Sequence, residues 1–100
     1  EGIPKFPAVK RDLALLADEE VSCGEITQTI VRAVKAVKAV ELFDVYRGGQ
    51  VPAGKKSMAF SVTFQAEPTA EKPLSGEAVD GFIRKILGNL KHNLNVEMRA

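Results

Sequence analysis

The chain has 100 residues, of which 45% are hydrophobic and 27% are charged, and its formal net charge is +1 at pH 7. This length supports one domain with one core, and the mixed composition argues against a disordered chain. The near-neutral charge argues against a strongly basic nucleic-acid binder, although a local cluster of Lys and Arg can attract RNA without a basic total.

Membrane and secretion signals are missing from the sequence. Its apolar runs stay well short of the ~20 residues that span a bilayer, and the first residues lack the apolar stretch of a signal peptide. Cys23 is the only cysteine, which excludes an internal disulfide and a cysteine zinc site. We therefore expect a cytoplasmic protein with no membrane partner. Because the chain starts at Glu1 rather than Met and a patterned segment runs to Ala100, we also expect a piece from the C-terminal end of a longer protein.

The N-terminal part of the chain predicts an extended lead-in followed by a strand. Residues 1–8 contain two prolines, which favour extended backbone, and residues 9–100 are expected to form the domain. The strand is predicted over residues 9–18, with Leu13 and Leu15 facing the core.

A helix is predicted next, after an acidic turn at residues 18–20. Ser22 and Glu25 fit a capping box, in which each side chain bonds the backbone N–H of the other residue. Apolar residues then recur at helical spacing from Ile26 onward, so we expect the helix to end near Val37.

Two strands are predicted around a glycine-containing turn at residues 48–54. The first covers residues 40–46; if Phe43 and Val45 face the core, Asp44 and Tyr46 face away from it. The second covers residues 56–64 and alternates cleanly between two faces. Its core-facing residues are expected to be Met58, Phe60, Val62 and Phe64.

The last predicted elements are a helix capped by Ser75 and a strand over residues 93–98. Gly81 and Gly88 lie inside this helix, where each costs about 1 kcal/mol relative to Ala. The resulting order, β-α-β-β-α-β, predicts a ferredoxin-like α+β fold: a four-stranded antiparallel sheet with both helices on one face. The other face of the sheet should be open, small and polar.

Familiar catalytic and RNA-binding motifs fit the sequence poorly. Residues 49–56 nearly match a phosphate-binding P-loop, but Lys56 replaces the required Ser or Thr and the loop joins two strands. The strand over residues 56–64 differs from an RNP1 motif because its Phe residues point inward. His92 suits the end of a helix, Cys23 has no reactive partner, and no metal-ligand spacing occurs. We predict a domain without a catalytic site.

Tyr46 is the strongest candidate for binding. A tyrosine on an open sheet face can stack on an unpaired base, which is worth about 1–3 kcal/mol. The alternative, that the ring covers apolar surface at a strand end, is equally compatible with the sequence. The nearby cations Arg47, Lys55 and Lys56 favour a phosphate-binding role. Ala14, Ser57 and Ala59 are small enough for a base to lie close to the sheet.

Residues 5–14, 42–48 and 54–60 together resemble the ferredoxin-fold anticodon-binding domain that ends the β subunit of bacterial phenylalanyl-tRNA synthetase. The resemblance covers essentially residues 4–100. It implies an α2β2 cytoplasmic ligase that charges tRNA(Phe) with ATP and Mg²⁺, with catalysis in the α subunit. It also implies that this domain binds the anticodon stem-loop and holds no cofactor of its own. The loose start of the second helix at Gly76 departs from what the family leads us to expect.

The resemblance also implies roles for particular residues. Tyr46 would stack on an anticodon base, Ser57 would form a hydrogen bond beside it, and Ala14 would permit close approach. The residues implied to contact the RNA backbone are Arg11, Arg47, Lys55 and Lys56.

Two alternatives share the same order of elements. An ACT-like domain would sense a small molecule such as an amino acid, with its site in the loop from Asp18 to Gly24. An acylphosphatase-like enzyme would need a phosphate loop that opens onto the first helix, and the sequence lacks one.

Overall fold

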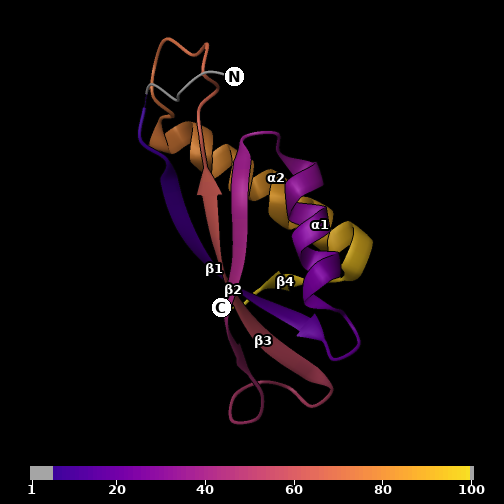
Figure 1. Ribbon diagram of the computed structural model, residues 1–100. Helices are drawn as coiled ribbons and strands as arrows, with labels where there is room; N and C mark the ends of the chain where they lie inside the picture. The colour runs from indigo at the N-terminus through magenta and orange to yellow at the C-terminus, as the bar shows by residue number, and fades with distance from the viewer. Residues whose placement is uncertain (1–5, 100) are drawn as a thin grey trace.

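The computed structural model describes residues 6–99, which form two helices and four strands in the predicted order. The elements are β1 (Val9–Asp18), α1 (Cys23–Ala33), β2 (Val37–Tyr46), β3 (Lys55–Phe64), α2 (Gly76–Leu94) and β4 (Glu97–Met98). The strand pairs are antiparallel, the sheet order is β2-β3-β1-β4, and both helices lie on one side of the sheet (Figure 1). The predicted ferredoxin-like α+β fold is confirmed.

The ends of the chain fall partly outside this description. Of the lead-in predicted over residues 1–8, residues 1–5 lie outside the described residues, as does Ala100. Phe6, Pro7 and Ala8 have no regular secondary structure, and the Phe6 carbonyl accepts a hydrogen bond from Gln65 Nε2 at 2.6 Å. This bond joins the approach to β1 to the end of β3.

The core lies between the helices and the sheet face that they cover. The alternation predicted for β3 is confirmed, since its core-facing residues are at most 2% exposed. Leu13 and Leu15 of β1 are buried on the same face, as predicted. The buried residues that meet them from the helices are Ile26, Ile30, Ala33, Val79, Ile86 and Leu90.

The start of α1 follows the prediction and its end does not. Both bonds of the capping box are present: Glu25 N–H donates to Ser22 Oγ at 3.0 Å, and Ser22 N–H donates to Glu25 Oε1 at 2.9 Å. However, the helix ends at Ala33 rather than near Val37. Val34 is extended, with φ −137° and ψ 123°, and Val37 already pairs with Phe64 in β2. Val34 and Val37 pack against the core although they lie outside the helix. Helical spacing of apolar residues therefore did not predict where the helix ends.

The end of α2 shortens the fourth strand. Asn95 caps the helix in the left-handed conformation with φ 56°, and its N–H donates to the Lys91 carbonyl at 3.1 Å. Val96 N–H donates to the Leu90 carbonyl at 3.2 Å. The strand predicted over residues 93–98 is therefore reduced to Glu97–Met98, because helix and cap occupy its first residues.

A β-bulge in β2 decides which residues reach each face. Leu42 pairs with Phe60 and Asp44 pairs with Ala59, so Phe43 is an extra residue between them. The prediction that Phe43 faces the core is wrong: the bulge displaces it, and it is 57% exposed. Beyond the bulge Val45 lies opposite Met58 on the helix side, which leaves Asp44 and Tyr46 on the other face, as predicted.

Candidate nucleic-acid interface

The sheet face away from the helices, called the open face below, is built from alternate residues of the strands. Antiparallel pairing arranges these side chains in rows across the sheet. Tyr46 lies opposite Ser57. The next row contains Asp44, Ala59 and Ala14, and the row after it contains Glu41, Ser61 and Asp12. Small side chains therefore form a floor beside an exposed aromatic ring.

A hollow of about 460 Å³ lies over this floor. It brings together Tyr46, Ser57 and Ala14, three of the residues predicted to bind RNA. Tyr46 is 46% exposed, so its ring is available to a ligand on the open face. The complete lining is Ala14, Asp44, Tyr46, Gly49, Gln50, Ser57, Ala59 and Arg99.

The turn after β2 packs tightly against the Tyr46 ring. Gly49 has φ +56°, a conformation that L side chains rarely adopt, and a Cβ at this position would collide with the Tyr46 hydroxyl. Gly48 also has a positive φ, +81°, but a Cβ there would meet open space. Gly49 therefore holds one edge of the ring in place, whereas Gly48 serves only the turn.

Arg99 is a site residue that the sequence did not reveal. Its N–H donates to the Ala14 carbonyl at 2.8 Å, which carries the pairing of β1 and β4 one residue past the strand. Its guanidinium carbon lies 5.7 Å from the centre of the Tyr46 ring, and Nη1 donates to Ser57 Oγ at 3.3 Å. Only the alternation of the last strand could have indicated this position, and that strand was predicted to end at Met98.

Two of the predicted phosphate ligands already have acidic partners. Arg47 Nε lies 2.7 Å from Glu19 Oε2, and Lys55 Nζ lies 3.0 Å from Asp18 Oδ1. The hydrogen bond from Arg47 lowers the pKa of the Glu19 carboxyl below its ordinary value, and the same bond raises the pKa of Arg47. The acidic turn at residues 18–20 therefore partly neutralises the cations beside Tyr46.

Two other predicted RNA contacts do not face the hollow. Lys56 lies opposite Ala17 on the helix side and is only 8% exposed, so the prediction that it borders the open face is wrong. Arg11 lies opposite Val62, also on the helix side, and its Nη1 donates to the Lys10 carbonyl at 3.2 Å. Strand alternation is the reason in both cases, since these residues share the faces of Met58 and Leu13.

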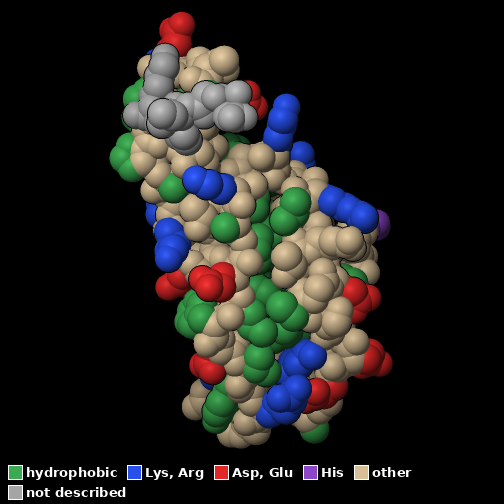
Figure 2. Space-filling view, viewed as in Figure 1, with side chains coloured by type: hydrophobic (Ala, Val, Ile, Leu, Met, Phe, Trp, Pro, Cys, Tyr) green, Lys and Arg blue, Asp and Glu red, His purple; other side chains and the backbone are tan. Residues whose placement is uncertain are grey.

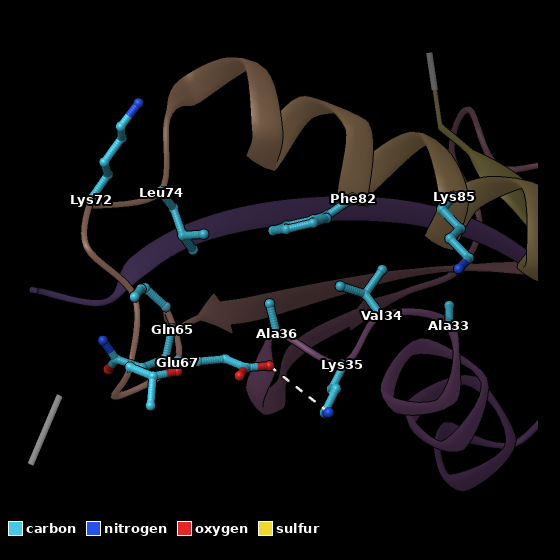
Figure 3. A pocket seen from close by; sticks show the side chains of 13 residues that line it. Ala33, Val34, Lys35, Ala36, Gln65, Glu67, Lys72, Leu74, Phe82 and Lys85 are labelled. Atoms are coloured by element: carbon cyan, nitrogen blue, oxygen red, sulfur yellow. Dashed lines mark ion pairs between the residues drawn. The ribbon is translucent and has the colours of Figure 1, made fainter. Parts of the chain in front are cut away.

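A second cavity, of about 530 Å³, lies beyond the other end of β3 (Figure 3). Its walls are mostly apolar and include Val34, Leu74 and Phe82, with an exposed ion pair at 3.9 Å between Lys35 and Glu67. Neither this cavity nor the hollow is lined by residues 18–24, where the ACT-like alternative puts its ligand. The polar hollow is therefore the better candidate for a nucleic-acid site.

The surface charge is mixed rather than strongly basic. Figure 2 shows Lys and Arg side chains scattered among Asp and Glu on the visible face.

Within residues 6–99, His, Cys, Asp and Glu side chains do not gather in threes as a metal site would require. Over the same range, no helix is both long and apolar enough to cross a membrane.

Comparison with known proteins agrees with this arrangement. The sequence model of the ferredoxin-fold anticodon binding domain matches residues 4–99. The phenylalanine–tRNA ligase β subunit of Lactococcus lactis is 45% identical over 98 residues, which is 97% of this chain and 12% of that protein. Those of Clostridium tetani and Geobacillus kaustophilus are each 42% identical over 101 residues, covering 99% and 100% of the chain. The chain thus spans about 12% of the length of these relatives. It belongs to the family of ferredoxin-fold anticodon-binding domains.

Proposed function

We propose that the chain is the tRNA-binding domain of a phenylalanine–tRNA ligase β subunit, and that its open face binds the anticodon loop of tRNA(Phe). The hollow around Tyr46 is the observation that carries this proposal. On this proposal the domain contributes binding energy only. Aminoacylation, with its ATP and Mg²⁺, belongs to the α subunit of an α2β2 ligase in the cytoplasm.

Stacking on Tyr46 supplies the first part of the binding energy. An unpaired base from a loop can lie on the ring, and such stacking is worth about 1–3 kcal/mol per base. Arg99 already lies over the ring at 5.7 Å. A base between the two needs about 7 Å, twice the spacing of about 3.4 Å between stacked bases. The guanidinium must therefore move outward by one to two ångströms, or turn toward a phosphate, when RNA binds.

Hydrogen bonds around the ring provide selectivity. Asp44 is an exposed acceptor one row from Tyr46, and the Ser57 hydroxyl accepts from Arg99 and can also donate. Guanine presents two adjacent N–H donors on its Watson–Crick edge, which suit a carboxylate. The stacked base is therefore expected to be guanine, with the flat floor of Ala14 and Ala59 admitting it close to the sheet.

Titration of the chain with the anticodon stem-loop of tRNA(Phe) tests the proposal. Tyr46→Ala should weaken binding by roughly 5- to 150-fold, the factor that corresponds to about 1–3 kcal/mol of stacking. Tyr46→Phe is the matched control, because it keeps the ring and should bind nearly as the unchanged chain does. Equal affinities for Tyr46→Ala and the unchanged chain would exclude stacking on this residue.

A further inference from the structure

The row formed by Asp12, Ser61 and Glu41 contains a polar group that lacks a partner. Ser61 is only 7% exposed, and its hydroxyl forms no hydrogen bond within the described part of the chain. Asp12 of β1 and Glu41 of β2 flank it directly through the strand pairing, and both are exposed. A buried hydroxyl without a partner destabilises a folded chain, whereas alanine, as at neighbouring Ala59, would not. The described part of the chain therefore supplies no partner for the Ser61 hydroxyl.

The pleat of β3 gives the direction of this hydroxyl. Ser57, Ala59 and Ser61 alternate with the buried Met58 and Phe60, so Ser61 belongs to the open face. Four residues separate Ser61 from Ser57, which is about 13 Å along a strand. The row thus continues the floor of the hollow away from Tyr46, on the surface proposed to bind RNA.

The chemistry of the row defines the ligand. Two carboxylates only accept hydrogen bonds, and a serine hydroxyl both donates and accepts. A matching group offers an N–H₂ donor beside a ring nitrogen acceptor, as the Watson–Crick edges of adenine and cytosine do. Uracil places a carbonyl oxygen where the amino group would be, directly against the carboxylates. The row therefore favours an amino-bearing base over uracil.

We propose that Asp12, Ser61 and Glu41 form a second base subsite, which selects an unpaired adenine or cytosine and rejects uracil. This inference rests on the proposed function, because the same RNA loop supplies both bases. The distance of about 13 Å between the two subsites far exceeds the spacing of about 3.4 Å between stacked neighbours. The two bases are therefore splayed apart, as single-stranded loops allow.

Atomic substitution in the RNA tests the subsite. The chain is titrated with the tRNA(Phe) anticodon stem-loop and with versions in which each adenine and each cytosine of the loop is replaced in turn by its deamino analogue. The analogues are purine for adenine and pyrimidin-2-one for cytosine. One replacement should weaken binding by roughly 5- to 150-fold, the factor that corresponds to about 1–3 kcal/mol for a bidentate base contact.

Variants of the row connect this loss to the protein. Ser61→Ala and Asp12→Asn should bind the unchanged stem-loop and the critical analogue with equal affinity. Ser61→Ala should also raise the melting temperature by a few °C, because the unpartnered hydroxyl is gone. Glu97→Gln is the matched control: it removes a carboxylate from β4, outside the row, and should keep the discrimination.

The outcomes separate the two proposals. If Tyr46→Ala weakens binding but Ser61→Ala and Asp12→Asn still discriminate, the second subsite is wrong and the proposed function stands. A stem-loop that does not bind the unchanged chain overturns both. Stabilisation of the RNA-free chain by MgCl₂ that disappears in Asp12→Asn would show that the row is a cation site instead.

Discussion

The two faces of β3 come from the same ten residues and have opposite properties. After Lys55 and Lys56 at the start of the strand, one face consists of large apolar side chains that are sealed beneath the helices, and a hydrogen-bonding ligand has nothing to contact there. The other consists of Ser, Ala and Thr, which pack little but leave polar atoms and room for a flat ligand. Stability and recognition are therefore assigned to alternate residues of one strand. Substitutions at neighbouring positions should separate the two properties.

The largest effect is expected on the covered face. Phe60 is fully buried, so Phe60→Ala should reduce the free energy of unfolding by about 3–5 kcal/mol through lost burial and a cavity. Urea denaturation monitored by circular dichroism measures this change. Ser57→Ala, on the open face, should alter stability by less than about 1 kcal/mol while it weakens stem-loop binding. Similar stability losses in both variants would contradict the division between the faces.

The next effect concerns the glycine turn. Gly49→Ala places a Cβ against the Tyr46 hydroxyl and should displace the ring, with a clear loss of stem-loop affinity. Gly48→Ala is the matched control, because its φ is also positive but its Cβ meets no atom. Both variants should lose about 1–3 kcal/mol of stability through backbone strain, and only Gly49→Ala should bind RNA more weakly. Calorimetry and fluorescence titration measure the two quantities.

Salt dependence should show how few cations on the open face are free. Four phosphate contacts, the number of backbone ligands predicted from the sequence, would give a slope of log affinity against log salt of about −2.8. Because Arg47 and Lys55 have acidic partners and the two other predicted cations lie on the helix side, we expect fewer than four contacts and a slope shallower than about −2.8. Glu19→Gln releases Arg47 and should steepen the slope by about 0.7. A slope unaffected by this change would mean that Arg47 does not reach the RNA.

The smallest expected effect is the pH dependence of the Glu19–Arg47 pair. The hydrogen bond from Arg47 lowers the pKa of Glu19 below its ordinary value of 4.5, so the unfolded chain takes up this proton more readily than the folded one. The stabilisation is present above that ordinary value and disappears as the pH falls through the lowered pKa. Both side chains are exposed, which keeps the effect small. Urea midpoints of the unchanged chain and Glu19→Gln should converge toward low pH.

Local patterns predicted much of this molecule. The capping box of Ser22 and Glu25 and the alternation from Met58 to Phe64 depend on neighbours in sequence, and both are confirmed. Alternation could also have placed Arg11 correctly. Residues two apart in a strand lie on the same face, so a Leu13 that faces the core puts Arg11 on the helix side as well. The family that the sequence was found to resemble is also the family whose model matches residues 4–99.

Features that depend on distant segments could not be predicted in this way. The bulge at Phe43 is defined only by the register of β2 against β3. The partners of Arg47 and Lys55 lie more than 25 residues earlier in the chain. Arg99 reaches Tyr46 because β4 pairs with β1, and neither residue carries a local signal of that contact.

The bulge in β2 makes the recognition surface depend on how one extra residue is accommodated. If Phe43 remained but paired regularly with β3, the residues after it would alternate the other way, so Asp44 and Tyr46 would turn beneath the helices and Val45 toward solvent. Deletion of Phe43 would instead join Leu42 directly to Asp44, and Asp44 and Tyr46 would keep their places on the open face. Among homologous chains, a missing residue at the position of Phe43 should therefore be compatible with the hollow, whereas loss of the bulge without loss of that residue should not.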